Sequence, residues 1–199
     1  MVKELAWRPE PGELALVLPN ERYPDLGKVK RLSLGPGQMA VVFVRDRPRP
    51  LVLSGGSHKL PKEATKLVLV STGPKESFYG VPKGMVYGQL GFSGKLTLRI
   101  GDGPEEVEDF VEELVLGRSI TTLEELVKWL VHNYLAPAFK DVVARRGMPP
   151  EEFVRAGWEE LAEEVKDVVN SYLMRYGLYL ENISVLWWAG PEGPLGLTP

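Results

Sequence analysis

The sequence predicts an α+β protein: a largely antiparallel sheet in the N-terminal half, three C-terminal helices packed against it, and a final strand. Apolar runs separated by Gly and Pro fill residues 1–103, whereas apolar residues recur at helical spacing over 104–177. The last strand is expected within 178–188. With 199 residues, of which 44% are hydrophobic and 26% charged, we expect one folded domain over 1–188 and a flexible tail over 189–199.

The predicted strands are short and end at glycine or proline. They are Glu13–Leu18, Met39–Val44, Leu51–Leu53, Lys66–Ser71, Val86–Phe92 and Lys95–Ile100. The second of these is apolar without a break, which is typical of a strand buried on both faces. Residues 20–37 are expected to form a loop that ends in a Gly-Pro-Gly turn. Gly55-Gly56 should end a hairpin, and Ser93-Gly94 should turn between the last two strands.

Three helices are predicted from apolar spacing and from residues that begin or end helices. The first has proline at its first helical position and acidic residues in its first turns, where the helix dipole favours them. The second has a capping-box sequence at its start, and Pro137 should kink or break it. The predicted ranges are 104–117, 122–147 and 149–177, followed by the strand Leu178–Trp188.

Composition excludes several kinds of chemistry. The chain has no cysteine, so disulfides, thiolate nucleophiles and cysteine-bound metals are excluded. His58 and His132 are its two histidines, and neither lies in a catalytic pattern, so we predict no enzyme activity, cofactor or metal. The longest apolar run, Met39–Val44, has six residues, against about 20 needed to span a bilayer. The N-terminus has no apolar secretory segment, so a cytoplasmic location is expected. Few amides and 17 prolines favour a thermophilic source.

The charges are distributed unevenly. Residues 1–103 hold 16 Lys/Arg and 9 Asp/Glu, a net charge of +7, whereas residues 104–199 hold 8 and 18, a net charge of −10. Anionic lipid headgroups or the acidic helices of another subunit are candidate partners for the basic loops. Nucleic acid is not expected, because aromatic residues are not interleaved with the basic ones. The candidate interaction residues are Lys28, Lys30, Arg31, Arg45, Arg47 and Arg49 on the basic side and Glu105, Asp109 and Glu112 on the acidic side.

Trp187 and Trp188 complete the candidate interaction residues. Adjacent residues of a strand point to opposite faces, so only one of the two can fill the core. A helix, the tail or another chain should cover the other.

Five features in order resemble the SPFH domain, also called band 7 or prohibitin homology, of stomatins, prohibitins and flotillins. The features are the Gly35-Pro36-Gly37 turn into Gln38–Val44, the charged turn Arg45–Pro50, the segment Gly55–Pro61, the step from Lys95–Ile100 into the helix at Pro104, and Tyr176–Ile183. The resemblance covers residues 13–188. The resemblance is greatest to a soluble prokaryotic subgroup termed virion-core-protein-like. The membrane segment and the long coiled coil of many family members are not found in this sequence.

The resemblance implies a non-enzymatic scaffold or assembly module that self-associates into a homo-oligomer. It also implies peripheral contact with an anionic membrane or a membrane protein, at the inner face of the membrane. Two alternatives stay open. One is a small-molecule-binding or hydrolytic domain that uses carboxylates such as Asp102, Glu105 and Asp109. The other is a peptide-binding adaptor with an exposed sheet edge near Trp187 and Trp188.

Overall fold

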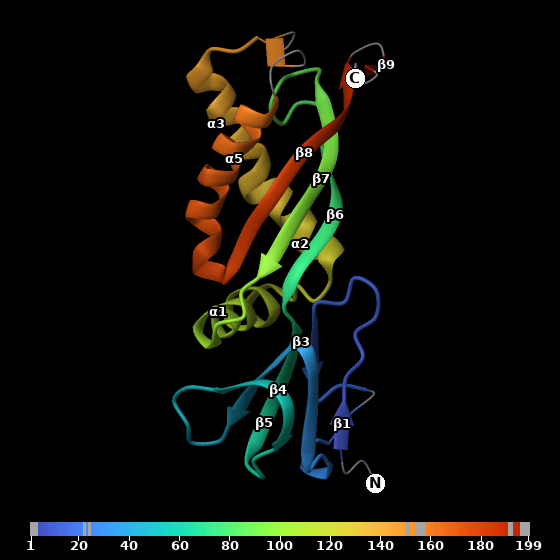
Figure 1. Ribbon diagram of the computed structural model, residues 1–199, viewed down its shortest axis with the longest axis vertical. Helices are drawn as coiled ribbons and strands as arrows, with labels where there is room; N and C mark the ends of the chain where they lie inside the picture. Colours follow the sequence, from blue (N-terminus) through green and yellow to red (C-terminus); the bar gives the residue numbers. More distant parts are fainter. Residues whose placement is uncertain are drawn as a thin grey trace. The chain divides into compact units, whose positions relative to one another are not determined.

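The computed structural model confirms the α+β class, and its strands divide between two sheets (Figure 1). It describes residues 4–21, 23, 25–149, 152–153, 158–190 and 193–195. The chain forms two compact units. The first comprises Met1–Gly73, Ile100–Leu123 and Arg175–Leu178, and the second comprises Pro74–Arg99, Glu124–Met174 and Tyr179–Pro199.

The first unit contains a five-stranded sheet. Its strands are β1 (Glu4–Ala6), β2 (Ala15–Leu18), β3 (Arg31–Val44), β4 (Leu51–Lys59) and β5 (Ala64–Ser71). The order is β1-β3-β5-β2, with β4 also paired to β3. β1 is parallel to β3, and the other pairs are antiparallel. A short 3₁₀ helix, η1 (Leu26–Lys28), precedes β3.

β3 and β4 stay paired on both sides of a large bulge in β3. Leu34 pairs with Gly56, and the next pair is Met39 with Ser54. Four residues of β3 therefore lie opposite one residue of β4, and such an insertion bends a ladder. Past the bulge, β3 exchanges its second neighbour β1 for β5.

Because of this bend, two predictions from the sequence are wrong. The loop expected over residues 20–37 ends at Lys30, because β3 begins at Arg31 and contains the Gly-Pro-Gly segment. Gly55 and Gly56 likewise lie inside β4 and do not end it. Gly37, Gly55 and Gly56 have φ angles of 67°, 28° and 88°, which glycine adopts without a Cβ penalty. The glycines bend a paired strand, a role that local sequence does not distinguish from a turn.

One apolar core lies inside the bent sheet. Leu32 and Leu34 come from before the bulge, and Ala40 and Val42 come from after it. They pack with Leu5, Trp7, Leu18, Leu26, Val29, Leu60, Leu67 and Leu69. Both halves of β3 therefore contribute to the same core. Met39–Val42 are buried, as the unbroken apolar run predicted, but Phe43 and Val44 at the end of the run are only half-buried.

The second sheet has the order β6-β7-β8-β9. Its strands are β6 (Gly73–Val81), β7 (Gly91–Ile100), β8 (Leu178–Gly190) and β9 (Gly193–Leu195). The turn predicted at Ser93-Gly94 is wrong, because β7 continues through it. The strand predicted over Val86–Phe92 is also wrong for its first five residues, which form turns before β7 begins at Gly91. A Cβ atom on Gly94 would lie 1.7 Å from the carbonyl oxygen of Ser184, so glycine here allows β8 to approach. β6 was not predicted.

Residues expected in the tail take part in this sheet. β9 pairs antiparallel with the end of β8, Trp188 opposite Leu195. Residues 191, 192 and 196–199 of the expected tail lie outside the described residues.

The predicted helices are present with changes in hydrogen-bonding pattern. They are α1 (Pro104–Asp109) with a π-helical continuation over Phe110–Leu116, α2 (Leu123–Leu130) with a π-helical continuation over Val131–Leu135, α3 (Ala136–Arg146), α5 (Trp158–Leu173) and the 3₁₀ helix η4 (Met174–Tyr176). Pro137 does not break the second helix. The π-helical segment directly before it takes up the change in hydrogen bonding that proline imposes. None of the described helices is long and apolar enough to cross a membrane.

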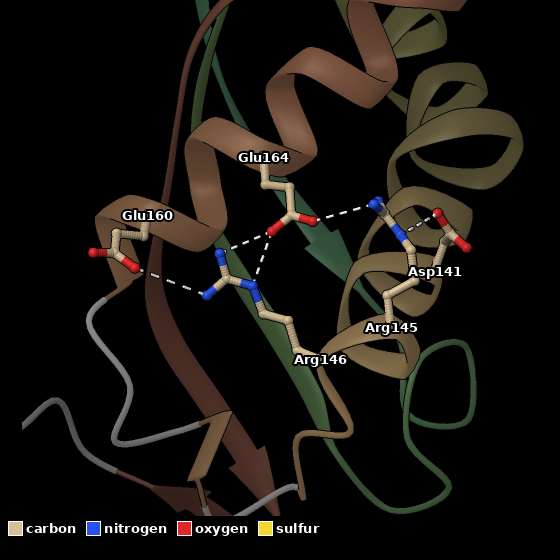
Figure 2. A network of polar contacts seen from close by, with 5 residues as sticks. All are labelled: Asp141, Arg145, Arg146, Glu160 and Glu164. Atoms are coloured by element: carbon tan, nitrogen blue, oxygen red, sulfur yellow. Dashed lines mark hydrogen bonds and ion pairs between the residues drawn. The ribbon is translucent and has the colours of Figure 1, made fainter.

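A charged network joins α3 to α5 (Figure 2). Glu164 accepts from both Nε and Nη2 of Arg146 at 2.8 Å, and its other oxygen lies 3.3 Å from Nη1 of Arg145. Nε of Arg145 donates to Oδ2 of Asp141 at 3.1 Å, whereas Oε2 of Glu160 lies 4.0 Å from Nη1 of Arg146. Glu164 is therefore the centre of the network and Glu160 is at its margin.

Glu164→Gln should lower the free energy of unfolding by about 1 kcal/mol, because it weakens charged bonds to two arginines at a half-buried position. Glu160→Gln is the matched control. The Glu160 side chain is 86% exposed, against 30% for Glu164, so its loss should cost less than about 0.3 kcal/mol. Thermal denaturation of both variants measures the difference, and equal effects would contradict a central Glu164.

Two glycines with similar backbones allow a test of close packing. Gly147 (φ 61°) and Gly177 (φ 63°) each follow a helical segment in the left-handed conformation. A Cβ atom on Gly147 would meet nothing within 4 Å, whereas on Gly177 it would lie 1.9 Å from the carbonyl oxygen of Glu106. Gly147→Ala should cost about 1 kcal/mol of unfolding free energy. Gly177→Ala should cost about 3 kcal/mol, because the backbone of α1 must also move. Urea denaturation compares them; equal losses would rule out the close contact.

Candidate interaction surfaces

His58 and the short loop before α1 have structural roles, whereas the side chain of His132 is exposed. His58 Nε2 lies 2.9 Å from the carbonyl oxygens of both Ser54 and Gly55, so it holds the bend of β4. It bonds the backbone as predicted, but from within a strand. Before α1, the Glu106 carboxylate accepts the N–H of Gly103 at 2.9 Å. Among the described residues, no group of three or more His, Asp or Glu is placed to hold a metal ion.

The two predicted basic groups, one at the start of β3 and one after its end, lie close together. Leu60 N–H donates to the carbonyl oxygen of Lys30 (3.1 Å), and Arg45 N–H donates to that of Glu63 (3.0 Å). Leu60 and Glu63 are three residues apart, so a segment of at most about 11 Å joins the two ends of β3. A straight strand of 14 residues would separate them by roughly 45 Å. The bend in β3 therefore brings both groups to one end of the unit.

This end of the first unit is the basic surface, which consists of Lys30, Arg31, Arg45, Arg47, Arg49, Lys59 and Lys62. All seven are exposed, and within the described part of the chain none forms an ion pair. Lys59 joins the surface because it pairs with Arg31 across β3 and β4, and Lys62 because it follows in the joining segment. Lys28 was also a predicted interaction residue, but its Nζ forms an ion pair with Oδ2 of Asp25 at 3.5 Å.

The acidic face of the first helix consists of Glu105, Asp109, Glu112 and Glu113, all of them exposed. Desolvation and the neighbouring charges of Glu105 and Glu113 raise the pKa of Asp109. Like charges four residues apart on a helix destabilise it. In the described part of the chain, no cation forms an ion pair with these carboxylates. The face therefore carries unbalanced repulsion that a cationic surface would relieve.

Opposite charges occur together in the first unit. From the sequence, this unit holds 14 Lys/Arg and 14 Asp/Glu, and the second unit holds 10 and 13. The charge division at residue 103 thus does not separate the two units. It separates the strands of the first unit from its own helix α1, so one unit carries both the basic surface and the acidic face.

The predicted tryptophan site is described only in its backbone. Trp187 and Trp188 lie in β8, and their side chains are outside the described residues. β9 pairs with β8 at Trp188, so the sheet edge expected to be free at that residue is occupied by this chain's own strand.

Comparison with models of known protein families and with curated proteins finds no match for this sequence.

Asp109→Asn should raise the free energy of unfolding by about 0.5 kcal/mol at neutral pH, because it removes two repulsions along the helix. Since the pKa is raised on folding, the folded protein binds the Asp109 proton more tightly than the unfolded chain does. Wild-type stability should therefore recover as the pH falls toward the ordinary aspartate pKa of 3.8, and the advantage of the variant should shrink. Urea unfolding at neutral and acid pH measures both effects.

Asp167→Asn, on the exposed surface of α5, is the control and should change little at either pH. An Asp109→Asn protein no more stable than wild type at neutral pH would contradict the repulsion.

Proposed function

We propose that this protein is a non-enzymatic assembly module that self-associates through its first unit. The observation that carries this proposal is the presence, on one unit, of a basic surface and an acidic face, neither of which is neutralised by ion pairs among the described residues. Charges that have no ion pair among the described residues are available to pair between chains. The SPFH-like order of motifs in the sequence supports the same role.

The physical argument favours a head-to-tail contact. The two surfaces are of opposite sign and consist of different elements. The basic surface consists of the ends of β3 and β4 with the segment after them, and the acidic face consists of helix α1 with its π-helical continuation. The basic surface of one copy would therefore dock on the acidic face of the next. A contact between two different patches leaves one of each free, so it continues into a ring or filament. It also relieves the repulsion around Asp109.

An anionic membrane surface is a second candidate partner for the basic surface. The seven cations of the basic surface would each gain on the order of 1 kcal/mol near anionic lipid. This contact and self-association compete for the same residues. A scaffold at a membrane surface could therefore consist of copies in which some basic surfaces bind the neighbouring copy and others bind lipid. Partner proteins could be present or absent.

Charge exchange between copies tests the assembly. At low salt, about 0.05 M NaCl, wild type should form assemblies that dissociate as salt screens the charges. The variants E105K/D109K/E112K and R45E/R47E/R49E should each lose this salt-dependent association. An equal mixture of the two should regain it, because each reversed surface meets a reversed partner. Sedimentation velocity measures all four samples.

The control E21K/E159K/D167K changes the net charge as much as the acidic-face variant but should associate like wild type. A wild type without salt-dependent association, or a mixture of variants that stays dissociated, would overturn the proposal. Co-sedimentation with anionic vesicles separates the membrane role: it should depend on the three arginines and not on the acidic face.

A further inference from the structure

The two edges of the second sheet differ in their protection. Asn170 of α5 blocks the outer edge of β8: its Nδ2 donates to the carbonyl oxygen of Leu180 (2.9 Å), and its Oδ1 accepts the Leu180 N–H (2.7 Å). A single side chain thus replaces one rung of a neighbouring strand. β9 covers the same edge from Trp188 to Gly190. Proteins protect sheet edges in such ways against further pairing.

The opposite edge, β6, has no such cover in the described part of the chain. β6 is the last strand of its sheet, and no other strand pairs with its outer side (Figure 1). Pro74, Glu76, Phe78 and Gly80 are exposed on one face of it. Phe78 is 69% exposed, more than any other large hydrophobic side chain described. A free edge with an exposed aromatic residue favours the addition of a strand.

The charges beside Phe78 indicate what kind of strand could pair with β6. Lys95 of β7 lies with its Nζ 5.2 Å from the centre of the Phe78 ring. Glu76 lies two residues from Phe78 on the same face of β6. Both Lys95 and Glu76 are exposed, and neither forms an ion pair with another described residue. Around Phe78 there is thus an anion on the edge strand β6 and a cation on the neighbouring strand β7.

We propose that β6 pairs antiparallel with β6 of a second copy, about a two-fold axis at Ser77. In this register, Glu76 of each copy lies opposite Phe78 of the other copy, on the same face of the joined sheet as that copy's Lys95. Glu76 and Lys95 are then two strands apart, so their long side chains would meet across the Phe78 ring. The symmetry makes this contact twice, as in any isologous interface. It also makes the two Phe78 side chains diagonal neighbours across the axis, within reach of each other. A strand of another protein could use the same main-chain groups. A second copy of β6 offers more than these main-chain groups, because its Glu76 carboxylate faces Lys95, and the same pair forms twice in the dimer.

This interface goes beyond the proposed function, since it lies on the second unit and rests on main-chain hydrogen bonds and an aromatic side chain. It should therefore persist at high salt, where contacts between exposed charges are screened. Sedimentation equilibrium at about 1 M NaCl should detect a dimer of the full chain. Phe78→Lys should weaken it by about tenfold or more. Met174→Lys, at another exposed hydrophobic residue (58%), is the matched control and should not.

The charge pair has its own test, at about 0.1 M NaCl in the R45E/R47E/R49E background. E76K and K95E should each weaken the dimer, and the double variant E76K/K95E should restore it. In hydrogen exchange, amides of β6 should become protected as the protein concentration rises.

A wild type that is monomeric at high salt, or a dimer that Phe78→Lys leaves intact, would overturn the β6 interface. The proposed function fails separately. If it alone is wrong, the high-salt dimer remains while the salt-dependent assembly is absent; if the β6 interface alone is wrong, the salt-dependent assembly remains without a high-salt dimer.

Discussion

The glycine-rich bend in the paired strands β3 and β4 determines both the core of the first unit and its surface. Because β3 turns at the bulge while still paired with β4, its two halves enclose one set of apolar side chains. The same turn returns the end of β3 toward its beginning, where the Leu60–Glu63 segment bonds to both. A straight β3 would have neither an enclosed core nor a single basic surface. The bend is therefore the constraint that links packing to the proposed assembly.

Glycine serves a second purpose elsewhere in the chain, where two backbones meet. Gly94 admits the main chain of Ser184, and Gly177 admits that of Glu106. In each case a segment near the C-terminus is held against one much earlier in the chain. These contacts leave no space for a Cβ atom, so they fix the position of β8 on β7 and of the residues before β8 on α1. The close approach, more than the flexibility of glycine, explains why these positions carry it.

The helical half was predictable because its signals are local. Apolar residues three and four apart, acidic first turns and Gly177 after the last helix all act within a few residues of themselves. The strands were less predictable because their glycines respond to distant partners. Ser93-Gly94 has the composition of a turn, and only the presence of Ser184 nearby shows that it is a strand. β6 has little apolar alternation and begins with Gly73-Pro74, so no local pattern marks it. Lys59 and Lys62 were missed for the same reason: their neighbours Arg31 and Arg45 are brought to them by a bend.

The two proposed contacts differ in the physical origin of their specificity, and that difference has a consequence for assembly. The contact between the basic surface and the acidic face joins unlike patches, depends on charge and continues beyond two copies into a ring or filament. The β6 contact joins like edges, depends on main-chain pairing and an apolar side chain, and closes at two copies. A chain that carries one contact of each kind can join head-to-tail rows in pairs. High salt would then break the charged contacts within the rows but leave the dimers formed through β6. Ionic strength alone would therefore determine which of the two assemblies is present.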